Sequence, residues 1–193
     1  MRGLVNRVAL AAGSLACGFI VTLGPSASAG AALAPATSTL TYLYGVSCTS
    51  KTSCTAAGYS NTAPPTTTSL AEKWNGTKWA IQHTPNPSGL GDQATLNGVS
   101  CSSRTACTAV GEFYDPVTST TASLAETWNG SKWTIRPTVN PPGHEVYLRG
   151  VSCSSPTTCT AIGVSFSGAV AGWTSLAERW NGANWTVQHT PNP

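Results

Sequence analysis

Residues 69–74 mix polar and apolar side chains in a short segment, which we interpret as a β-strand with two faces. Leu70, Glu72 and Trp74 share one face of such a strand, because successive side chains point to opposite sides. Lys73 lies on the other face and is replaced by Thr or Arg where the pattern returns, so we expect it to be exposed. No stretch has helical periodicity over about ten residues. The pattern predicts an all-β protein.

Further short strands surround this segment. An Asn-Gly pair follows it and favours a tight turn between two strands. Residues 78–83 then form a second strand, which ends at the proline-rich residues 84–87 because proline cannot donate to a β-ladder. Residues 42–48 and 54–59 precede the segment as another predicted strand pair. One unit therefore contains four short antiparallel strands.

The whole pattern occurs three times. The phrase SLAEKWNGTKW, which begins at residue 69, returns as SLAETWNGSKW and as SLAERWNGANW, and each copy follows GVSC-x5-CTA-x-G. A fixed period of about 52 residues is typical of a stacked repeat architecture. We therefore divide the folded domain into units at residues 43–95, 96–147 and 148–193.

Six of the seven cysteines occur as one pair in each unit, always separated by five residues. In an exported chain such a regular, even set predicts disulfides. Fifteen pairings are open in principle, and a local pair within each unit is the simplest. Zinc binding is the weaker interpretation because no histidine recurs at metal-site spacing. We expect no metal and no cofactor. The predicted disulfide residues are Cys48, Cys54, Cys101, Cys107, Cys153 and Cys159.

The N-terminus has the features of a signal peptide. Two arginines precede an apolar segment, and small residues in an A-x-A pattern follow it. We expect cleavage after Ala29, which makes residues 1–29 the signal peptide and residues 30–42 a linker. A lipoprotein signal at Cys17 is the weaker alternative, because the apolar segment continues beyond it. These features predict a secreted protein with no membrane association after cleavage.

The composition is low in charge. Charged residues make up 9% of the chain, with ten basic and seven acidic residues, and cleavage of the signal peptide would remove two of the basic ones. Such a balance gives no electrostatic basis for binding nucleic acid or an anionic membrane. We expect neither partner.

The repeat also resembles a known type of protein. The glycines at Gly58, Gly111 and Gly163, followed by two tryptophans that flank a turn, resemble a kelch repeat. The longer phrase, with its terminal QxTPNP, looks like the repeats of secreted actinobacterial β-propeller-like proteins. This resemblance implies propeller-blade units and an extracellular location, but no activity. The single glycine and the disulfide depart from the kelch pattern.

Three units leave the closure of the fold open. Closed propellers typically have four to eight blades. Two copies of the chain could form a six-bladed ring as a homodimer, the chain could belong to a longer array, or it could stay open. Alternatively, three units could close as a β-trefoil or β-prism with threefold pseudo-symmetry. Exposed blade faces favour self-association within the blade interpretation.

The residues shared by all units are predicted to be structural. Three equivalent acids cannot provide the asymmetric carboxyl pair that glycoside hydrolysis needs, so we expect them to accept hydrogen bonds from backbone or indole N–H groups. Tryptophans at equivalent positions are expected in the core. We expect this more strongly before the Asn-Gly turn than after it. These structural residues are Glu72, Glu126, Glu178, Trp74, Trp128 and Trp180.

Binding residues are expected where the units differ. Residues 60–68, 112–122 and 164–174 vary most and are predicted to be rim loops between the second and third strands. The candidate ligand-binding residues in these segments are Glu112, Tyr114, Asp115 and Trp173.

Three functions remain as hypotheses. The first is a secreted, non-enzymatic module that presents these loops to a cell-surface glycan or protein. The second is a structural or self-assembling envelope protein. The third is a propeller-type hydrolase or lyase, which the lack of unpaired acids and histidines at shared positions argues against. No catalytic residue is predicted.

Overall fold

The three-dimensional structure is a computed structural model of the chain. It describes residues 39–63, 66–87, 93–141, 144–168 and 172–191. The predicted signal peptide and most of the predicted linker lie outside the described residues. All three repeats belong to one folded unit, residues 37–193.

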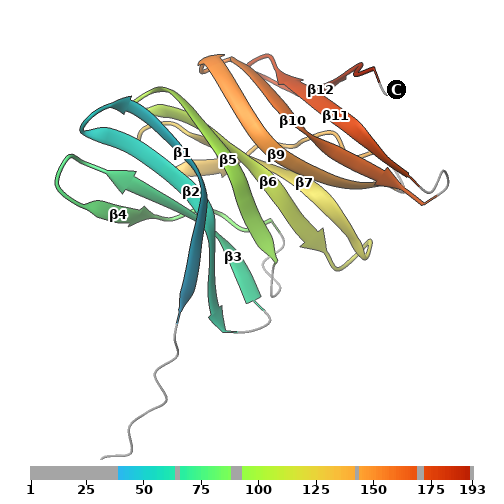
Figure 1. Ribbon diagram of the computed structural model, residues 1–193, viewed down its shortest axis with the longest axis horizontal. Coiled ribbons are helices and arrows are strands. Elements are labelled where there is room, and N and C mark those ends of the chain that lie inside the picture. The colour runs from blue at the N-terminus through green and yellow to red at the C-terminus, as the bar shows by residue number, and fades with distance from the viewer. Residues whose placement is uncertain (1–38, 64–65, 88–92, 142–143, 169–171, 192–193) are drawn as a thin grey trace, which may run out of the picture. The chain divides into compact units, whose positions relative to one another are not determined.

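The described residues form strands and no helix, arranged as three four-stranded antiparallel sheets, one for each repeat (Figure 1). The first sheet contains β1 (Leu40–Ser50), β2 (Ser53–Ala63), β3 (Thr66–Trp74) and β4 (Trp79–Gln82). The second contains β5 (Ala94–Ser103), β6 (Ala106–Asp115), β7 (Thr120–Trp128) and β8 (Trp133–Ile135). The third contains β9 (His144–Ser155), β10 (Thr158–Ser167), β11 (Gly172–Trp180) and β12 (Trp185–Gln188). The predicted all-β fold with three four-stranded units is confirmed.

The strands are longer than predicted, and the expected rim loops are largely absent. In the second sheet β6 and β7 pair without interruption from Cys107↔Trp128 to Asp115↔Thr120. The same hairpin extension in the other sheets turns most of residues 60–68 and 164–174 into strand. Threonine, serine and aromatic residues dominate these segments, and they suit a pleated ladder. The prediction of long variable loops was therefore wrong.

Local turns and disulfides fix the hairpins of each sheet. The Asn-Gly turn between β3 and β4 places Gly76 at φ 101°, and the equivalent glycines have φ 98° and 96°. Asn75 supports this turn by accepting hydrogen bonds from the backbone N–H groups of Thr77 and Lys78. Each predicted cysteine pair is joined as a local disulfide across the hairpin of the first two strands. The local disulfide pairing is confirmed.

The sheets are stacked in chain order, with the first strand of each beside the first strand of the next. Strand β1 packs against β5, and β5 packs against β9 (Figure 1). The second and third strands of each sheet also cover the first strand of its successor. We call the face toward the preceding sheet the front face and the face toward the following sheet the rear face.

Each contact between sheets joins large apolar side chains to small ones. Leu96, Val99 and Trp133 on the front of the second sheet pack against Ala57 and Ala71 on the rear of the first. The contact between the second and third sheets repeats this arrangement. Leu96 and its equivalent in the third sheet are fully buried, and burial of each contributes roughly 2 kcal/mol to folding.

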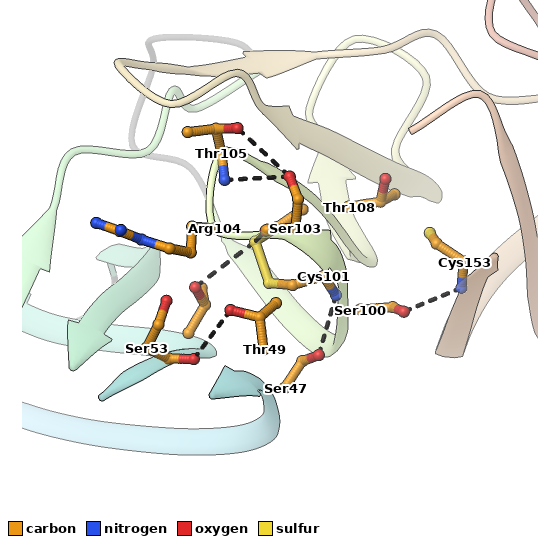
Figure 2. Close-up of a disulfide and its surroundings, with 12 residues drawn as sticks. Ser47, Thr49, Ser53, Ser100, Cys101, Ser103, Arg104, Thr105, Thr108 and Cys153 are labelled. Atoms are coloured by element: carbon orange, nitrogen blue, oxygen red, sulfur yellow. Dashed lines mark hydrogen bonds between the residues drawn. A yellow bond between two sulfur atoms is a disulfide. The ribbon is translucent and has the colours of Figure 1, made fainter. Parts of the chain in front are cut away.

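A polar ladder accompanies the apolar contact. The backbone N–H of Cys101 donates to the Ser47 hydroxyl of the preceding sheet at 3.0 Å, and that of Cys153 donates to Ser100 at 2.9 Å. Figure 2 shows both hydrogen bonds, on either side of the middle disulfide. The Ser-Cys dipeptide of the repeated phrase thus supplies an acceptor on the rear of its sheet and a donor on the front.

The stack is open. Among the described residues, the first and third sheets share no extended contact, so the three units form neither a closed propeller nor a threefold-closed barrel. The trefoil and prism alternatives do not describe this arrangement. The physical reason is that each sheet buries its front on the rear of the one before it, which builds a series with two free ends.

The tryptophans are distributed differently from the prediction. Trp133 and Trp185, which follow the turn, are buried, whereas Trp74 and Trp128, which precede it, are only half-buried. Trp180 is buried as expected. Trp79, which follows the turn of the first sheet, is 43% exposed because no preceding sheet in the described chain covers it. The stronger expectation of burial before the turn was therefore wrong for the second sheet, whereas the two tryptophans of the third sheet are buried alike.

Lys73 is another exception, because its face is not exposed. It is half-buried between the first two sheets, where its ammonium donates to the Thr55 hydroxyl at 3.2 Å and to the backbone oxygen of Arg104 at 3.4 Å. Partial burial and the nearby Arg104 charge lower the pKa of this lysine. Lys73 lies on the rear face of the first sheet, which the second sheet covers, and alternation along the strand does not show which face is covered.

Candidate functional site

The first strand of every sheet contains a β-bulge at the same place in the repeat. The pairing register shifts around Tyr44 in β1, around Asn97 in β5 and around Arg149 in β9. A bulge leaves one residue outside the ladder and redirects its side chain. The flanking leucine and glycine are the same in all three sheets, whereas the bulged residue differs in each. The scaffold thus presents three copy-specific side chains.

A glycine on the neighbouring strand makes each bulge possible. A Cβ atom at Gly111 would lie 1.9 Å from the backbone oxygen of Thr95, just before the bulge. The equivalent distances in the first and third sheets are 1.8 and 1.9 Å. No side chain fits at such a distance. This glycine of the repeat is therefore needed for the close approach of the two strands at the bulge, and not for a turn.

Glu112 connects the bulged residues of the second and third sheets. Its carboxylate accepts a hydrogen bond from the Asn97 side-chain amide and forms an ion pair with Arg149, with 3.2 Å between Oε1 and the guanidinium. The same Asn97 amide donates to the backbone oxygen of Leu148 at 2.8 Å. These contacts fix three chemically different polar groups in one place.

The site is partly shielded from water. Burial raises the pKa of Glu112, and the neighbouring Arg149 and Asn97 oppose this effect without cancelling it. The side chain of Glu112 is 18% exposed, whereas that of Arg149 is 53% exposed. The guanidinium therefore faces solvent and can exchange its contacts for those of a ligand.

Aromatic side chains border the polar groups. The ring centroids of Tyr44 and Tyr59 lie 5.8 Å apart. Both rings line a hollow together with Asn97, Glu112 and Arg149. A neighbouring hollow shares Tyr59 and Glu112 and extends to Tyr114 and Tyr147. We call the residues Tyr44, Tyr59, Asn97, Glu112 and Arg149 the bulge site.

The structure gathers most of the predicted binding residues near this site. Glu112 belongs to it, and Tyr114 lines the adjoining hollow. Trp173 is 58% exposed and packs against Tyr147 in a tilted arrangement, with 5.5 Å between the ring centroids, which continues the aromatic surface. All three lie on strands rather than in loops.

Asp115 has a different role. Its carboxylate accepts a hydrogen bond from the backbone N–H of Val117 at 2.8 Å, in the turn that joins β6 and β7. This backbone hydrogen bond lowers the pKa of Asp115. The residue thus stabilises its own turn and is not among the residues that line either hollow.

Two of the three acids shared by the repeats lie between the sheets. Glu126 and Glu178 are fully buried, each in a separate contact. Glu126 accepts from the Ser69 hydroxyl at 3.3 Å, and Glu178 accepts from the backbone N–H of Val139 at 3.5 Å. Burial raises their pKa values to about 8 and about 7. Glu72, on the front of the first sheet, is half-buried.

Sequence reasoning did not find four of the five residues of the bulge site. Asn97 and Arg149 occupy the one variable position inside an otherwise fixed L-x-G-V-S-C phrase, and Tyr44 is their equivalent. That variation inside a fixed phrase was the available signal. A search for the most variable segments does not detect this signal, because only one residue differs inside a phrase that is otherwise identical in the three repeats.

Comparison of the sequence with protein-family models and with curated proteins found no match. In the described ranges no helix is long and apolar enough to cross a membrane. The described residues also contain no group of three or more His, Cys, Asp or Glu side chains arranged to hold a metal ion.

Proposed function

We propose that this protein is a secreted, non-enzymatic β-repeat module that binds a cell-surface glycan through the bulge site. The observation that carries this proposal is the convergence of Tyr44, Asn97 and Arg149, the three copy-specific bulge residues, around Glu112. A binding site on a rigid scaffold is expected where otherwise identical units differ.

The chemistry of the site favours a polyhydroxylated ligand. A carboxylate, an amide and a guanidinium provide acceptors and donors within one hollow. Tyrosine rings beside them offer flat apolar surfaces that retain a polar hydroxyl. A sugar ring presents the same combination, with hydroxyl groups around its edge and C–H groups on its faces. A protein surface is the second ligand class that we retain.

A catalytic role is less well supported. Burial raises the pKa values of Glu126 and Glu178 to about 8 and about 7, and the two acids lie in different contacts between sheets, since one accepts from Ser69 and the other from Val139. They are therefore not the facing carboxyl pair that glycoside hydrolysis requires. Glu112 is held by an amide and a guanidinium, an arrangement suited to binding.

Secretion forms part of the proposal. The three intramolecular disulfides are compatible with an extracellular protein. Cleavage of a signal peptide after Ala29 would deliver the folded domain to that compartment. Mass analysis of the chain recovered from the medium of a producing cell tests this step, and a retained N-terminus would contradict it.

The binding test uses a panel of cell-wall and capsular glycans with the purified chain. Arg149→Gln removes the exposed guanidinium and should weaken binding about tenfold or more, because a charge-assisted hydrogen bond contributes roughly 1.5–3 kcal/mol. The affinity is measured by isothermal titration calorimetry for each glycan that binds the wild type.

Arg104→Gln is the matched control. Arg104 lies in the hairpin turn between β5 and β6, in the region of the middle disulfide (Figure 2). This variant should bind as the wild type does. Equal affinities for the wild type and Arg149→Gln would place the ligand elsewhere, and no binding by the wild type to any glycan would remove the glycan class.

A second candidate function is a self-assembling envelope protein. It is favoured by the exposed apolar side chains on the outer faces of the first and third sheets, such as Val46 and Ile162.

A further inference from the structure

The front of the first sheet exposes residues that are buried in the other sheets. Val46 is 63% exposed, whereas its equivalent Val99 is 8% exposed. Leu43 and Trp79 are 47% and 43% exposed, and their equivalents in the second and third sheets are buried. The repeated sequence has therefore placed a complete front face where the described chain supplies no preceding sheet.

The rear of the third sheet has the complementary property. Ile162 is 58% exposed, although its equivalents Ala57 and Val110 are fully buried. Ala177 corresponds to Ala71, which receives the large side chains of the second sheet. This face has the small and branched residues on which a front face packs elsewhere in the same molecule.

We propose that two copies of the chain associate head to tail, with the front of the first sheet of one copy on the rear of the third sheet of the other. The contact would repeat the two that already join successive sheets. It is heterologous, because two different faces meet, and a pair of copies joined by two such contacts forms a closed ring of six sheets.

The polar groups of the existing contacts have their counterparts on these two faces. The Ser152 hydroxyl is exposed on the rear of the third sheet, at the position from which Ser47 and Ser100 accept. The backbone N–H of Cys48 in the second copy is the equivalent donor. Head-to-tail association therefore extends the ladder that Figure 2 shows by one more hydrogen bond.

A side-chain hydrogen bond is matched in the same way. The indole N–H of Trp133 donates to Gln82 of the preceding sheet at 3.2 Å. Trp79 and Gln188 are the equivalent pair on the two outer faces, at the same positions in their repeats. Both the apolar and the polar parts of the interface thus point to a second copy of this chain as the partner.

The close approach of backbones at the repeated glycines gives a specific test of the proposed contact. A Cβ at Gly45 would lie 3.0 Å from the Cα of Gly98, and a Cβ at Gly98 would lie 3.0 Å from the Cα of Gly150. A Cβ at Gly150 meets only the Ile162 side chain, at 3.7 Å, which is an ordinary contact. Gly150→Ala is accordingly harmless within one copy, but it would crowd Gly45 of the second copy in the proposed contact.

The test is sedimentation velocity of the purified, disulfide-bonded protein over a range of concentrations. The wild type should sediment as a two-chain species that dissociates on dilution. Val46→Lys, Ile162→Lys and Gly150→Ala should each sediment as single chains and keep the wild-type circular dichroism spectrum. Val117→Lys is the matched control, since Val117 is 89% exposed in the turn between β6 and β7, and it should remain a two-chain species.

Mixing two variants distinguishes head-to-tail contact from a symmetric one. Val46→Lys retains an intact rear face and Ile162→Lys an intact front face, so an equimolar mixture should recover a two-chain species that neither forms alone. A wild type that stays a single chain at all concentrations would overturn the proposal. Self-association of Ile162→Lys by itself, at wild-type strength, would also overturn it, because it would mean that front meets front.

Discussion

A buried glutamate marks each contact between successive sheets. Glu126 has one oxygen hydrogen-bonded to Ser69, and its other oxygen has no partner among the described residues. Burial of the charged form is costly, so the pKa rises to about 8 and the neutral acid predominates at neutral pH. The residue behaves as an uncharged polar group inside an apolar contact.

This protonation makes stability depend on pH. The pKa of Glu126 rises from an ordinary 4.5 in the unfolded chain to about 8 in the folded one, so the folded state binds the proton more tightly. The stabilisation of the folded state by protonation of Glu126 is complete below pH 4.5. It falls as the pH rises from 4.5 to about 8 and is lost above that pH. Glu178, with a pKa of about 7, acts in the same direction.

We predict that Glu126→Gln flattens this profile. The amide keeps the shape and carries no charge, so the variant should exceed the wild type in unfolding free energy at pH 8, by up to a few kcal/mol, since one pKa unit corresponds to about 1.4 kcal/mol. Urea unfolding at pH 5 and pH 8 measures the difference. Half-buried Glu145 is the control position, and Glu145→Gln should follow the wild-type profile. A wild type that gains stability between these pH values would contradict the assignment.

A second prediction concerns the glycine that permits each bulge. Gly111→Ala places a Cβ 1.9 Å from the Thr95 oxygen and should destabilise the protein by about 3 kcal/mol or more. Gly168→Ala, in open space, is the control and should change the unfolding free energy by less than about 0.5 kcal/mol. Thermal or urea unfolding compares the two. Similar stabilities would mean that the bulge is not held by this close approach.

At the level of single elements, the hairpins were predictable because their signals are local. The Asn-Gly pair fixes a turn within four residues, and the cysteine spacing fixes a pairing within seven. The lengths of the strands were not predictable in this way. β6 and β7 extend into residues 112–122, up to the turn at 116–119, because the two strands satisfy each other's backbone groups. A single segment contains no record of its partner.

The disulfides stabilise these hairpins modestly. A cross-link that closes so short a loop removes little chain entropy, and Cys48→Ala with Cys54→Ala should cost about 2 kcal/mol. The double variant should keep the all-β circular dichroism spectrum and unfold at lower urea concentration. Complete loss of structure at neutral pH would show instead that the first sheet depends on its disulfide to form.

At the scale of the whole molecule, the repeat determines both the stacking order of the sheets and the position of the bulge site. Repetition of front and rear faces builds an open series, and the bulge at the same point of each first strand brings Tyr44, Asn97 and Arg149 together. The sequence showed that these positions differ between copies, but not that they converge. Their convergence depends on which sheet covers which, and burial of the Lys73 face could not be predicted for the same reason.

The most direct test of glycan binding at the bulge site is two-dimensional NMR of labelled protein, titrated with the glycan that binds best in the panel. We predict that the Asn97 side-chain amide and the backbone signals of Tyr44, Glu112 and Arg149 shift with ligand concentration, while those of the Asp115–Val117 turn do not. Shifts confined to that turn or to the Asn-Gly turns, with Asn97 unchanged, would contradict the assignment of the bulge site.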